Sequence, residues 1–234
     1  MNMKHISILL FFLFCIQRIL SQDNGCNCSS EEDFLNWQQK GLIGVEYTNP
    51  VNGYKGEEQY LQDWTNGEIY LNNGGFIPNV ILRYDRYLDQ LLWMRMSDYR
   101  KGVLNKDIIN GFKLYKEWII PESVYTKKRI ELPWIDSTEV FLQVMVEGEI
   151  SMYVYRKVKK EPVEFKLMDN TKYILESAGK VYAVPLRRKS LLEMPFIVKA
   201  EMKKVLRKYR IAVMNNEKGM ADAIDLYNKR KFDL

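Results

Sequence analysis

The chain has 234 residues, a formal net charge of +5 and 47% hydrophobic residues, which suits a globular protein with a substantial core. Its single histidine, His5, lies in a segment that we expect to be removed, so the mature chain would contain none. This excludes Ser-His-Asp and Cys-His catalysis and removes the usual ligand of zinc, copper and haem. The sequence also lacks G-x-S-x-G, P-loop and dinucleotide-binding glycine motifs. We therefore expect a non-catalytic protein with no cofactor and no metal site.

Residues 1–21 have the pattern of a secretory signal peptide. Lys4 gives a basic start, residues 6–16 are apolar, and Ser21 is small enough to precede a cleavage site. The apolar run is shorter than the about 20 residues that span a bilayer, and Arg18 interrupts it. The pattern predicts export to the periplasm or outer membrane, with Gln22 as the mature N-terminus. Retention as an anchor is the alternative.

Cys26 and Cys28 are the cysteines that remain after cleavage. Export permits a disulfide between them, although a C-x-C bridge is strained and therefore reducible. An intermolecular bridge, two free thiols and lipidation at Cys26 are the alternatives. A metal site is not expected, because no second ligand pair is present.

Charge is distributed unevenly along the mature chain. Residues 22–120 carry 10 Lys and Arg against 14 Asp and Glu, whereas residues 121–234 carry 23 against 16. A basic half can indicate a polyanionic partner, and for an exported protein we expect lipid headgroups or anionic glycans rather than nucleic acid. Solvated lysine side chains explain the same excess without a partner.

Residues 22–56 are predicted to form an N-terminal extension. Ser30 is a candidate N-cap for a short helix that carries Trp37 and ends at Gly41. Residues 42–47 are a candidate strand, and residues 48–56 are rich in Asn, Gly and Pro and are expected to form a loop.

Residues 57–186 are predicted to form an antiparallel β domain. Its centre is a meander with strands at residues 68–71 and 76–84 around the turn Asn72–Gly75, continuing into residues 87–96. Further strands are expected at residues 111–115, 118–121 and 124–132. The nearest carboxylate pairs are Glu57 with Glu58 and Asp85 with Asp89, and a hydrolase using such a pair is a third, weaker hypothesis.

The clearest hairpin joins residues 139–146 to residues 149–158 through Glu147 and Gly148. Its first strand is apolar on both faces, which indicates a strand covered on both sides. On its second strand an aliphatic face opposes a face that carries Tyr153 and Tyr155. Residues 159–162 read as a charged link, followed by short strands at residues 165–167, 171–176 and 180–186.

Residues 187–234 are predicted to form a helical hairpin that packs on the sheet. Apolar residues recur at helical spacing in its first helix, with Pro195 in the first turn: Met194, Val198, Met202, Val205 and Tyr209. Basic residues fill the opposite face as candidate contacts for an anionic surface: Lys199, Lys203, Lys204, Arg207, Lys208 and Arg210. A second stripe follows from Met220 to Tyr227.

Two stretches together resemble a known group of proteins. The first is W-x-x-G-E-I-x-L-x-N-G-x-x-I-x-N-x-x-L-R-Y-D at residues 64–85, and the second is E-V-F-L-Q-V-M-V-E-G-E-I-S-M-Y at residues 139–153 with the closing helices. They are similar to uncharacterised exported β-rich proteins of the Bacteroidota. The resemblance implies a β meander with closing helices and carries over no catalytic residue.

The expected fold class is therefore α+β, mainly β, with an antiparallel meander forming a sandwich, roll or open barrel and a C-terminal helical hairpin. The expected function is a non-catalytic exported protein that acts by protein–protein interaction at the cell envelope. The alternative is a periplasmic carrier that binds a lipid or another apolar ligand in an open barrel.

Overall fold

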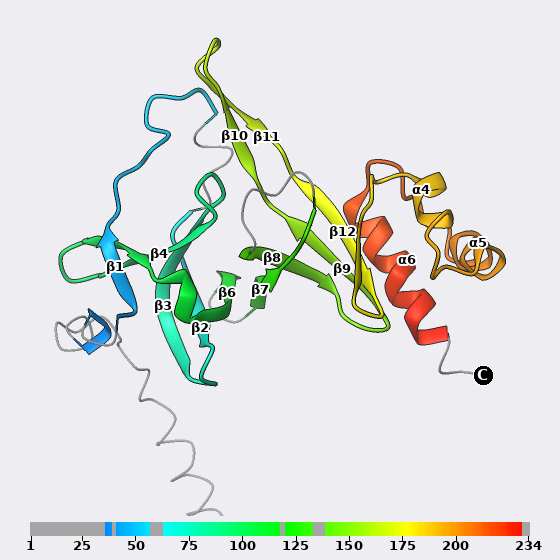
Figure 1. Cartoon of the computed structure of the whole chain (residues 1–234), viewed down its shortest axis with the longest axis horizontal. Coiled ribbons are helices and arrows are strands. Elements are labelled where there is room, and N and C mark those ends of the chain that lie inside the picture. Colours follow the sequence, from blue (N-terminus) through cyan, green and yellow to red (C-terminus); the bar gives the residue numbers. More distant parts are fainter. Residues whose placement is uncertain (1–35, 39–40, 57–62, 118–119, 133–138, 231–234) are drawn as a thin grey trace, which may run out of the picture.

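The computed structural model describes residues 36–38, 41–56, 63–117, 120–132 and 139–230 (Figure 1). The strands are β1 (Ile43–Glu46), β2 (Thr65–Leu71), β3 (Phe76–Asp85), β4 (Gln90–Met94), β5 (Lys101–Leu104), β6 (Ile109–Glu117), β7 (Ile120–Arg129), β8 (Glu139–Val146), β9 (Ile150–Tyr155), β10 (Val158–Glu161), β11 (Lys166–Asp169), β12 (Lys172–Ser177) and β13 (Lys180–Ala183). The helices are the 3₁₀ turn η1 (Lys106–Ile108), α4 (Arg188–Leu192), α5 (Lys199–Lys208) and α6 (Glu217–Arg230).

Eleven strands form one open antiparallel sheet in the order β1-β5-β4-β3-β2-β6-β7-β8-β9-β12-β13. Neighbours in this order are mostly neighbours in sequence, as in a meander, and β2 pairs with β6 to join two such runs. β10 and β11 leave the sheet as a separate hairpin that projects from the body (Figure 1). The structure thus confirms the expected fold class.

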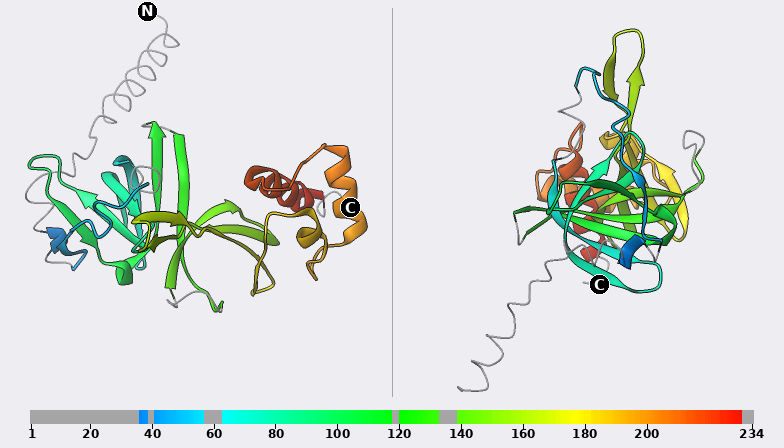
Figure 2. Two further views of the ribbon diagram at one scale, coloured as in Figure 1. Left: turned by 90° about the horizontal axis from the view of Figure 1, so that it is seen from above. Right: turned by 90° about the vertical axis from the view of Figure 1, so that its left-hand side faces the viewer.

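The first part of the sheet curls around an aromatic core (Figure 2). Strands β1 to β8 all contribute to this core, whose centre is formed by the rings of Tyr84, Phe112, Tyr125 and Phe141. The Phe112 and Tyr125 rings stack with their centroids 4.6 Å apart. Trp37, which precedes the sheet, closes one side of the core with its ring centroid 5.2 Å from that of Trp93. Large planar side chains fill the inside of the curl and exclude water from it.

The second part of the sheet is covered by different elements on its two faces. Ile150, Met152 and Val154 of β9 face the helices, whereas Tyr153 and Tyr155 face the opposite side, as the alternation predicted. In β8, Val140, Phe141 and Leu142 are all fully buried, which confirms a strand covered on both sides. Its pairing with β9 shifts register between Val144 and Val146, so Val146 turns toward the helices instead of continuing the face of Val140.

Three assignments in the sheet and its N-terminal flank differ from the sequence prediction. β1 pairs with β5, so the sheet begins inside the stretch expected to be an extension. The third strand of the meander begins at Gln90 rather than at residue 87, because Asp85 accepts hydrogen bonds from the backbone amides of Tyr87 and Leu88 and holds a turn. The stretch expected to be a charged link is strand β10, paired with β11.

The C-terminal region contains three helices rather than a hairpin of two. Pro195 lies between α4 and α5 instead of in a first turn, and Val198 and Tyr209 sit at the two ends of α5, both about half exposed. The buried residues of α5 are Met202, Val205 and Leu206. The prediction of helices that dock on the sheet is confirmed, whereas the assignment of Val198 and Tyr209 to the buried stripe is wrong. The signal peptide, Cys26, Cys28, Glu57 and Glu58 lie outside the described residues.

Candidate functional site

The three C-terminal helices form a strongly basic lobe at one end of the molecule (Figure 1). We call residues 187–230 the helical lobe. It carries 12 Lys and Arg against 5 Asp and Glu, whereas residues 121–186 carry 10 of each. The basic excess of the C-terminal half therefore belongs to the helices and not to the strands before them.

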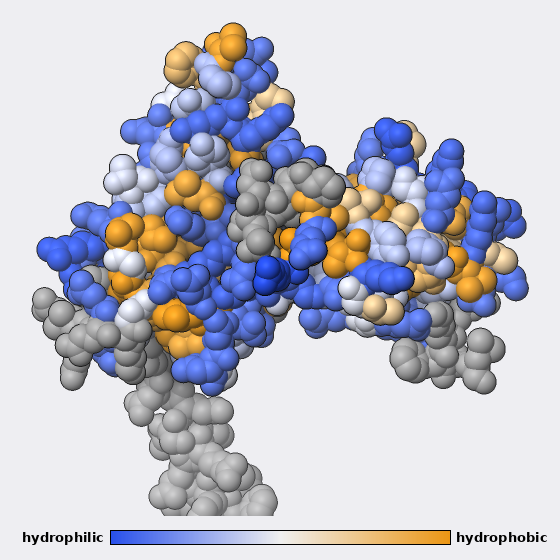
Figure 3. Space-filling view, in the orientation of Figure 1, coloured by the Kyte–Doolittle hydropathy of each residue, from blue (hydrophilic) through white to orange (hydrophobic). Residues whose placement is uncertain are grey.

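The cationic face of α5 is open to solvent. Five of the six predicted basic contact residues are exposed and Lys203 is half-buried. No ion pair joins any of the six to a carboxylate within the described part of the chain. The structure therefore places Lys199, Lys203, Lys204, Arg207 and Lys208 on α5, whereas Arg210 follows the C-cap Tyr209 with a backbone φ of +52° and lies outside the predicted helical face. Hydrophilic residues, interspersed with apolar ones, cover this end of the molecule in Figure 3.

The buried face of α5 is enclosed by the neighbouring helices. Met202, Val205 and Leu206 lie in the core that α5 shares with α6 and α4, with exposed fractions of 0%, 2% and 4%. The Val198 amide at the start of α5 donates to the Tyr227 hydroxyl of α6 at 3.0 Å. A helix that lies in a bilayer interface inserts an apolar face into lipid. Because that face of α5 is occupied, its outward contacts are mainly electrostatic and polar, and the half-exposed Val198 and Tyr209 add apolar surface at its two ends.

A partly buried ion pair and an amide side chain fix the helical lobe on the sheet. Arg156 at the end of β9 makes a two-pronged contact with Glu217 at the start of α6, with one N–O distance of 2.9 Å. Asn228 near the end of α6 accepts from the Ile150 amide and donates to the Ile150 carbonyl, at 3.1 and 2.8 Å. These contacts lie at opposite ends of α6, so they set its direction across the sheet as well as its position.

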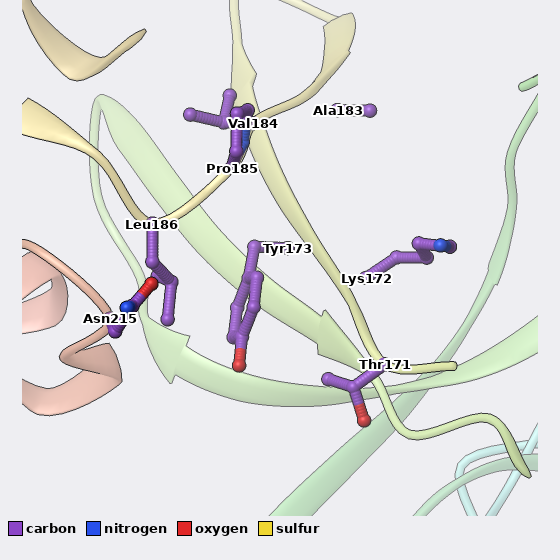
Figure 4. Close-up of a pocket in the computed structure, with 8 residues that line it drawn as sticks. All are labelled: Thr171, Lys172, Tyr173, Ala183, Val184, Pro185, Leu186 and Asn215. Carbon is purple, nitrogen blue, oxygen red and sulfur yellow. The ribbon is translucent and has the colours of Figure 1, made fainter. Parts of the chain in front are cut away.

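A shallow pocket lies where the sheet meets the helical lobe (Figure 4). It has a volume of about 590 Å³ and is lined by Thr171, Lys172, Tyr173, Ala183, Val184, Pro185, Leu186 and Asn215. The side chains of Tyr173 and Leu186 point into its middle, whereas Lys172 points away from them (Figure 4). Burial raises the pKa of the Tyr173 hydroxyl, and the adjacent Glu217 carboxylate raises it further. The pocket has the size of a small-ligand site and few polar groups for recognition.

The candidate carboxylate pair is buried and hydrogen-bonded. Asp85 is 0% and Asp89 4% exposed. Asp85 also accepts from the Tyr47 hydroxyl at 2.9 Å, while Asp89 accepts from the Tyr84 hydroxyl and the Lys106 ammonium, each at 2.5 Å. Burial raises the pKa of Asp89, and the contacts with Lys106 and Tyr84 oppose that rise. With these hydrogen-bond partners, the two carboxylates are suited to stabilising the turn before β4.

A second group of titratable side chains lies across β2 and β6. The Tyr70 hydroxyl donates to Glu68 at 2.7 Å, and Lys113 lies 3.7 Å from the same carboxylate. Burial would raise the pKa of Glu68, but hydrogen bonds from Tyr115 and Tyr70 and the charge of Lys113 outweigh it and lower the pKa. The side chains of this group therefore satisfy one another's charges and hydrogen-bonding atoms.

Within the described residues, no cluster of three or more His, Cys, Asp and Glu side chains could hold a metal ion. The same part of the chain contains no helix that combines the length and apolar character needed to cross a bilayer. No protein-family model, curated protein or solved structure matches the chain. The similarity to exported Bacteroidota proteins therefore stays a prediction.

Two features escaped the sequence analysis. Arg156 continues the two-residue alternation of Ile150, Met152 and Val154, and a charge in that aliphatic row was itself a signal for the partly buried pair with Glu217. Val163 and Phe165 form the tip of the β10–β11 hairpin, but the preceding stretch was taken as a link. The alternation of Val163, Glu164 and Phe165 after Pro162 gave a weak signal for a turn with exposed apolar residues.

Proposed function

We propose that the protein is a non-catalytic exported binding protein that contacts an acidic protein surface at the cell envelope through the cationic face of α5. The observation that carries this proposal is the group of five basic residues on one side of α5, followed by Arg210 just beyond its C-cap, which have no ion pair among the described residues. Complementary charge on a partner would raise the association rate and fix the orientation of the complex.

The packing of α5 favours a protein partner over insertion into lipid. Its buried apolar residues are enclosed by the neighbouring helices, so contact with a bilayer would use mainly the ammonium and guanidinium groups. Purely electrostatic contacts are weakened by salt, whereas a protein partner can add hydrogen bonds and shape complementarity. Arg156 and Asn228 fix α6, against which α5 packs, and so hold the cationic face rigid for such a contact.

A matched pair of variants tests the proposal. The first combines Lys204→Glu, Arg207→Glu and Lys208→Glu on α5, and the control combines Lys101→Glu, Arg129→Glu and Lys180→Glu on the sheet; all six side chains are exposed. Both variants change the net charge equally. Chemical cross-linking in native envelopes, read out by mass spectrometry, should identify a protein partner with an acidic surface.

We expect the α5 variant to lower the yield of that cross-link about tenfold, because three lost charge contacts together contribute roughly 1–3 kcal/mol. The sheet variant should leave the yield unchanged. Equal yields from both variants, or recovery of phospholipid alone, would overturn a protein partner for α5.

Export is a separate part of the proposal. Its support is the basic start, the short apolar run and Ser21. N-terminal sequencing of the protein from its native envelope should begin at Gln22. An intact Met1 or a lipid on Cys26 would contradict cleavage after Ser21.

The pocket at the junction of sheet and helices supports the carrier as a second candidate. Because aromatic side chains fill the inside of the curled sheet, a small apolar ligand would bind in a surface pocket such as this one. Native mass spectrometry after gentle purification should then show a bound molecule. Leu186→Arg would displace that molecule, and Lys172→Ala, at a side chain that points away, would retain it. An unliganded wild-type mass would contradict the carrier.

A further inference from the structure

The β10–β11 hairpin ends in two exposed apolar side chains. Val163 is 86% and Phe165 63% exposed, and apolar surface gathers at the projecting tip (Figure 3). Phe165 has a backbone φ of +47°, in the left-handed region that is unfavourable for a bulky residue. The chain therefore accepts two costs at the tip, exposed apolar area and a strained backbone.

A distant segment of the chain stiffens this hairpin. The Lys55 amide donates to the Phe165 carbonyl at 2.7 Å, and the Leu167 amide donates to the Lys55 carbonyl at 2.9 Å. Behind these bonds Val51, Val158 and Leu167 form a small core and are 0%, 1% and 5% exposed. The tip is thus held at a fixed position, which reduces the entropy that a contact there would cost.

Aromatic and cationic side chains follow below the tip. The Tyr54 ring centroid lies 5.8 Å from that of Phe165. The Lys160 ammonium lies 4.8 Å from the centroid of Tyr54 and 4.9 Å from that of Tyr87. Lys55 and Lys159 are exposed, and Glu164 at the tip is ion-paired with Lys166. This sequence of apolar, tyrosine and lysine layers matches the layers of a membrane interface.

We propose that the tip of the β10–β11 hairpin is a membrane-surface contact, in which Val163 and Phe165 enter the boundary between headgroups and acyl chains of a phospholipid bilayer. Lys55 and Lys159 then remain level with the lipid phosphates. The tip is convex and presents two side chains, far less than the about 800 Å² per partner that a stable protein interface buries. A fluid bilayer can accommodate two protruding side chains, whereas a protein partner would need a pocket of complementary shape. The inference goes beyond the proposed function and involves none of the residues of α5.

Vesicle sedimentation of the mature chain tests the inference. The variant combines Val163→Asp and Phe165→Asp, and its control combines Val45→Asp and Tyr99→Asp, whose side chains are 71% and 64% exposed elsewhere on the molecule. All four positions are exposed, so circular dichroism should show a folded chain for both variants. We expect wild type and control to bind phosphatidylcholine vesicles that contain phosphatidylglycerol, and the tip variant to bind at least about tenfold more weakly.

The depth of insertion gives a second measurement. In a Phe165→Trp chain, lipids brominated on their acyl chains should quench more fluorescence than in the wild-type chain, and the difference reports the residue at the tip. Equal vesicle binding by the tip variant and its control, or no added quenching at residue 165, would overturn the proposal. So would a wild-type chain that ignores vesicles while the tip variant loses a protein cross-link, because that result assigns the tip to a protein socket. The triple α5 variant keeps the tip intact, so failure of one proposal leaves the other measurable.

Discussion

The two parts of the sheet cover their apolar faces in different ways. The first part covers its apolar face by curling, and rings from several strands meet inside the curl, with the Tyr84 and Tyr125 centroids 5.0 Å apart. The second part stays open and is covered by helices, with Met152, Met202 and Met220 at the contact. Rigid rings fill the inside of a curl well, whereas flexible methionine side chains adapt to the uneven surface between a helix and a sheet.

The two regions also differ in how their charged side chains are paired. In the curled part the buried Asp89 has its own partners, Tyr84 and Lys106. Glu217 of the helical lobe pairs with Arg156 at the end of the sheet strand, while the cations of α5 face outward with no ion pair among the described residues. The covering layer of helices therefore exposes its charge, whereas the charge of Asp89 in the curl is buried with its partners.

The largest expected effect is at the helical cover. Val205 is 2% exposed in the core between helices and sheet, so Val205→Asp buries an unpaired carboxylate and should lower the free energy of unfolding by at least ~4 kcal/mol. Lys204→Asp, on the exposed side of α5, should change it by less than ~0.5 kcal/mol. Urea denaturation compares the two. Equal stability would show that α5 is not docked.

The next largest effect is at the centre of the curl. Phe112 is fully buried and contacts the rings of Tyr84, Tyr125 and Phe141. Phe112→Ala should lower the free energy of unfolding by ~3–4 kcal/mol through lost contacts and the cavity that remains. Hydrogen exchange should show faster opening of β2 and β6 than of α6. Uniform acceleration over the whole chain would mean that the two regions unfold as one unit.

A pH-dependent effect separates the buried charge of the curl from the exposed charge of the lobe. Lys106→Met removes the cation that opposes the raised pKa of Asp89, so the folded-state pKa should rise further above the unfolded value. An acid with a raised folded pKa keeps its full stability contribution below the unfolded pKa and loses it as pH rises through the folded pKa. The variant should therefore be less stable than wild type by about 2–3 kcal/mol at neutral pH and by less in acid.

Thermal denaturation of wild type and Lys106→Met from neutral to acidic pH shows whether the stability penalty of the variant shrinks in acid. Lys204→Met on α5, where no ion pair is lost, should show no such pH dependence. A penalty for Lys106→Met that grows in acid would reverse the assigned direction.

The smallest of these effects concerns the junction between the hairpin and α6. Gly148 lies in the predicted turn, and a Cβ atom there would lie 2.5 Å from the side-chain nitrogen of Asn228. Gly148→Val should therefore disturb the two bonds of Asn228 to Ile150 and cost about 1–3 kcal/mol. If Asn228→Ala is introduced first, the added cost of Gly148→Val should shrink in a double-mutant cycle of melting curves. Additive costs would contradict this contact.

Gly148 also shows how a correct prediction can have a different physical reason. The sequence placed it in a turn and suggested a backbone conformation available to glycine, as is found for Gly74 with a φ of +82°. At Gly148 the structural requirement is instead the close approach of Asn228, which lies 80 positions later in the chain. Turn residues identify the turn locally, but what packs against it is decided by distant segments.

The sequence by itself determined the local pattern of this protein. Asn72–Gly75 predicted the turn between β2 and β3, and alternation assigned Ile150, Met152 and Val154 to one face and Tyr153 and Tyr155 to the other. It also identified five basic residues of α5, because helical spacing separates a polar face from an apolar one, whereas Arg210 lies beyond the end of the helix. These features depend on neighbours within a few residues.

The tertiary structure decided what no local pattern contains. The register shift near Val144 moves Val146 to the helical side, and the segment around Lys55 stiffens a hairpin more than 100 residues away. Val198 and Tyr209 fit the helical period of α5 but lie at its two caps, where both are about half exposed. Periodicity gives the direction of a side chain relative to its own element, whereas burial depends on which other element arrives there, and that is set by the packing of the whole chain.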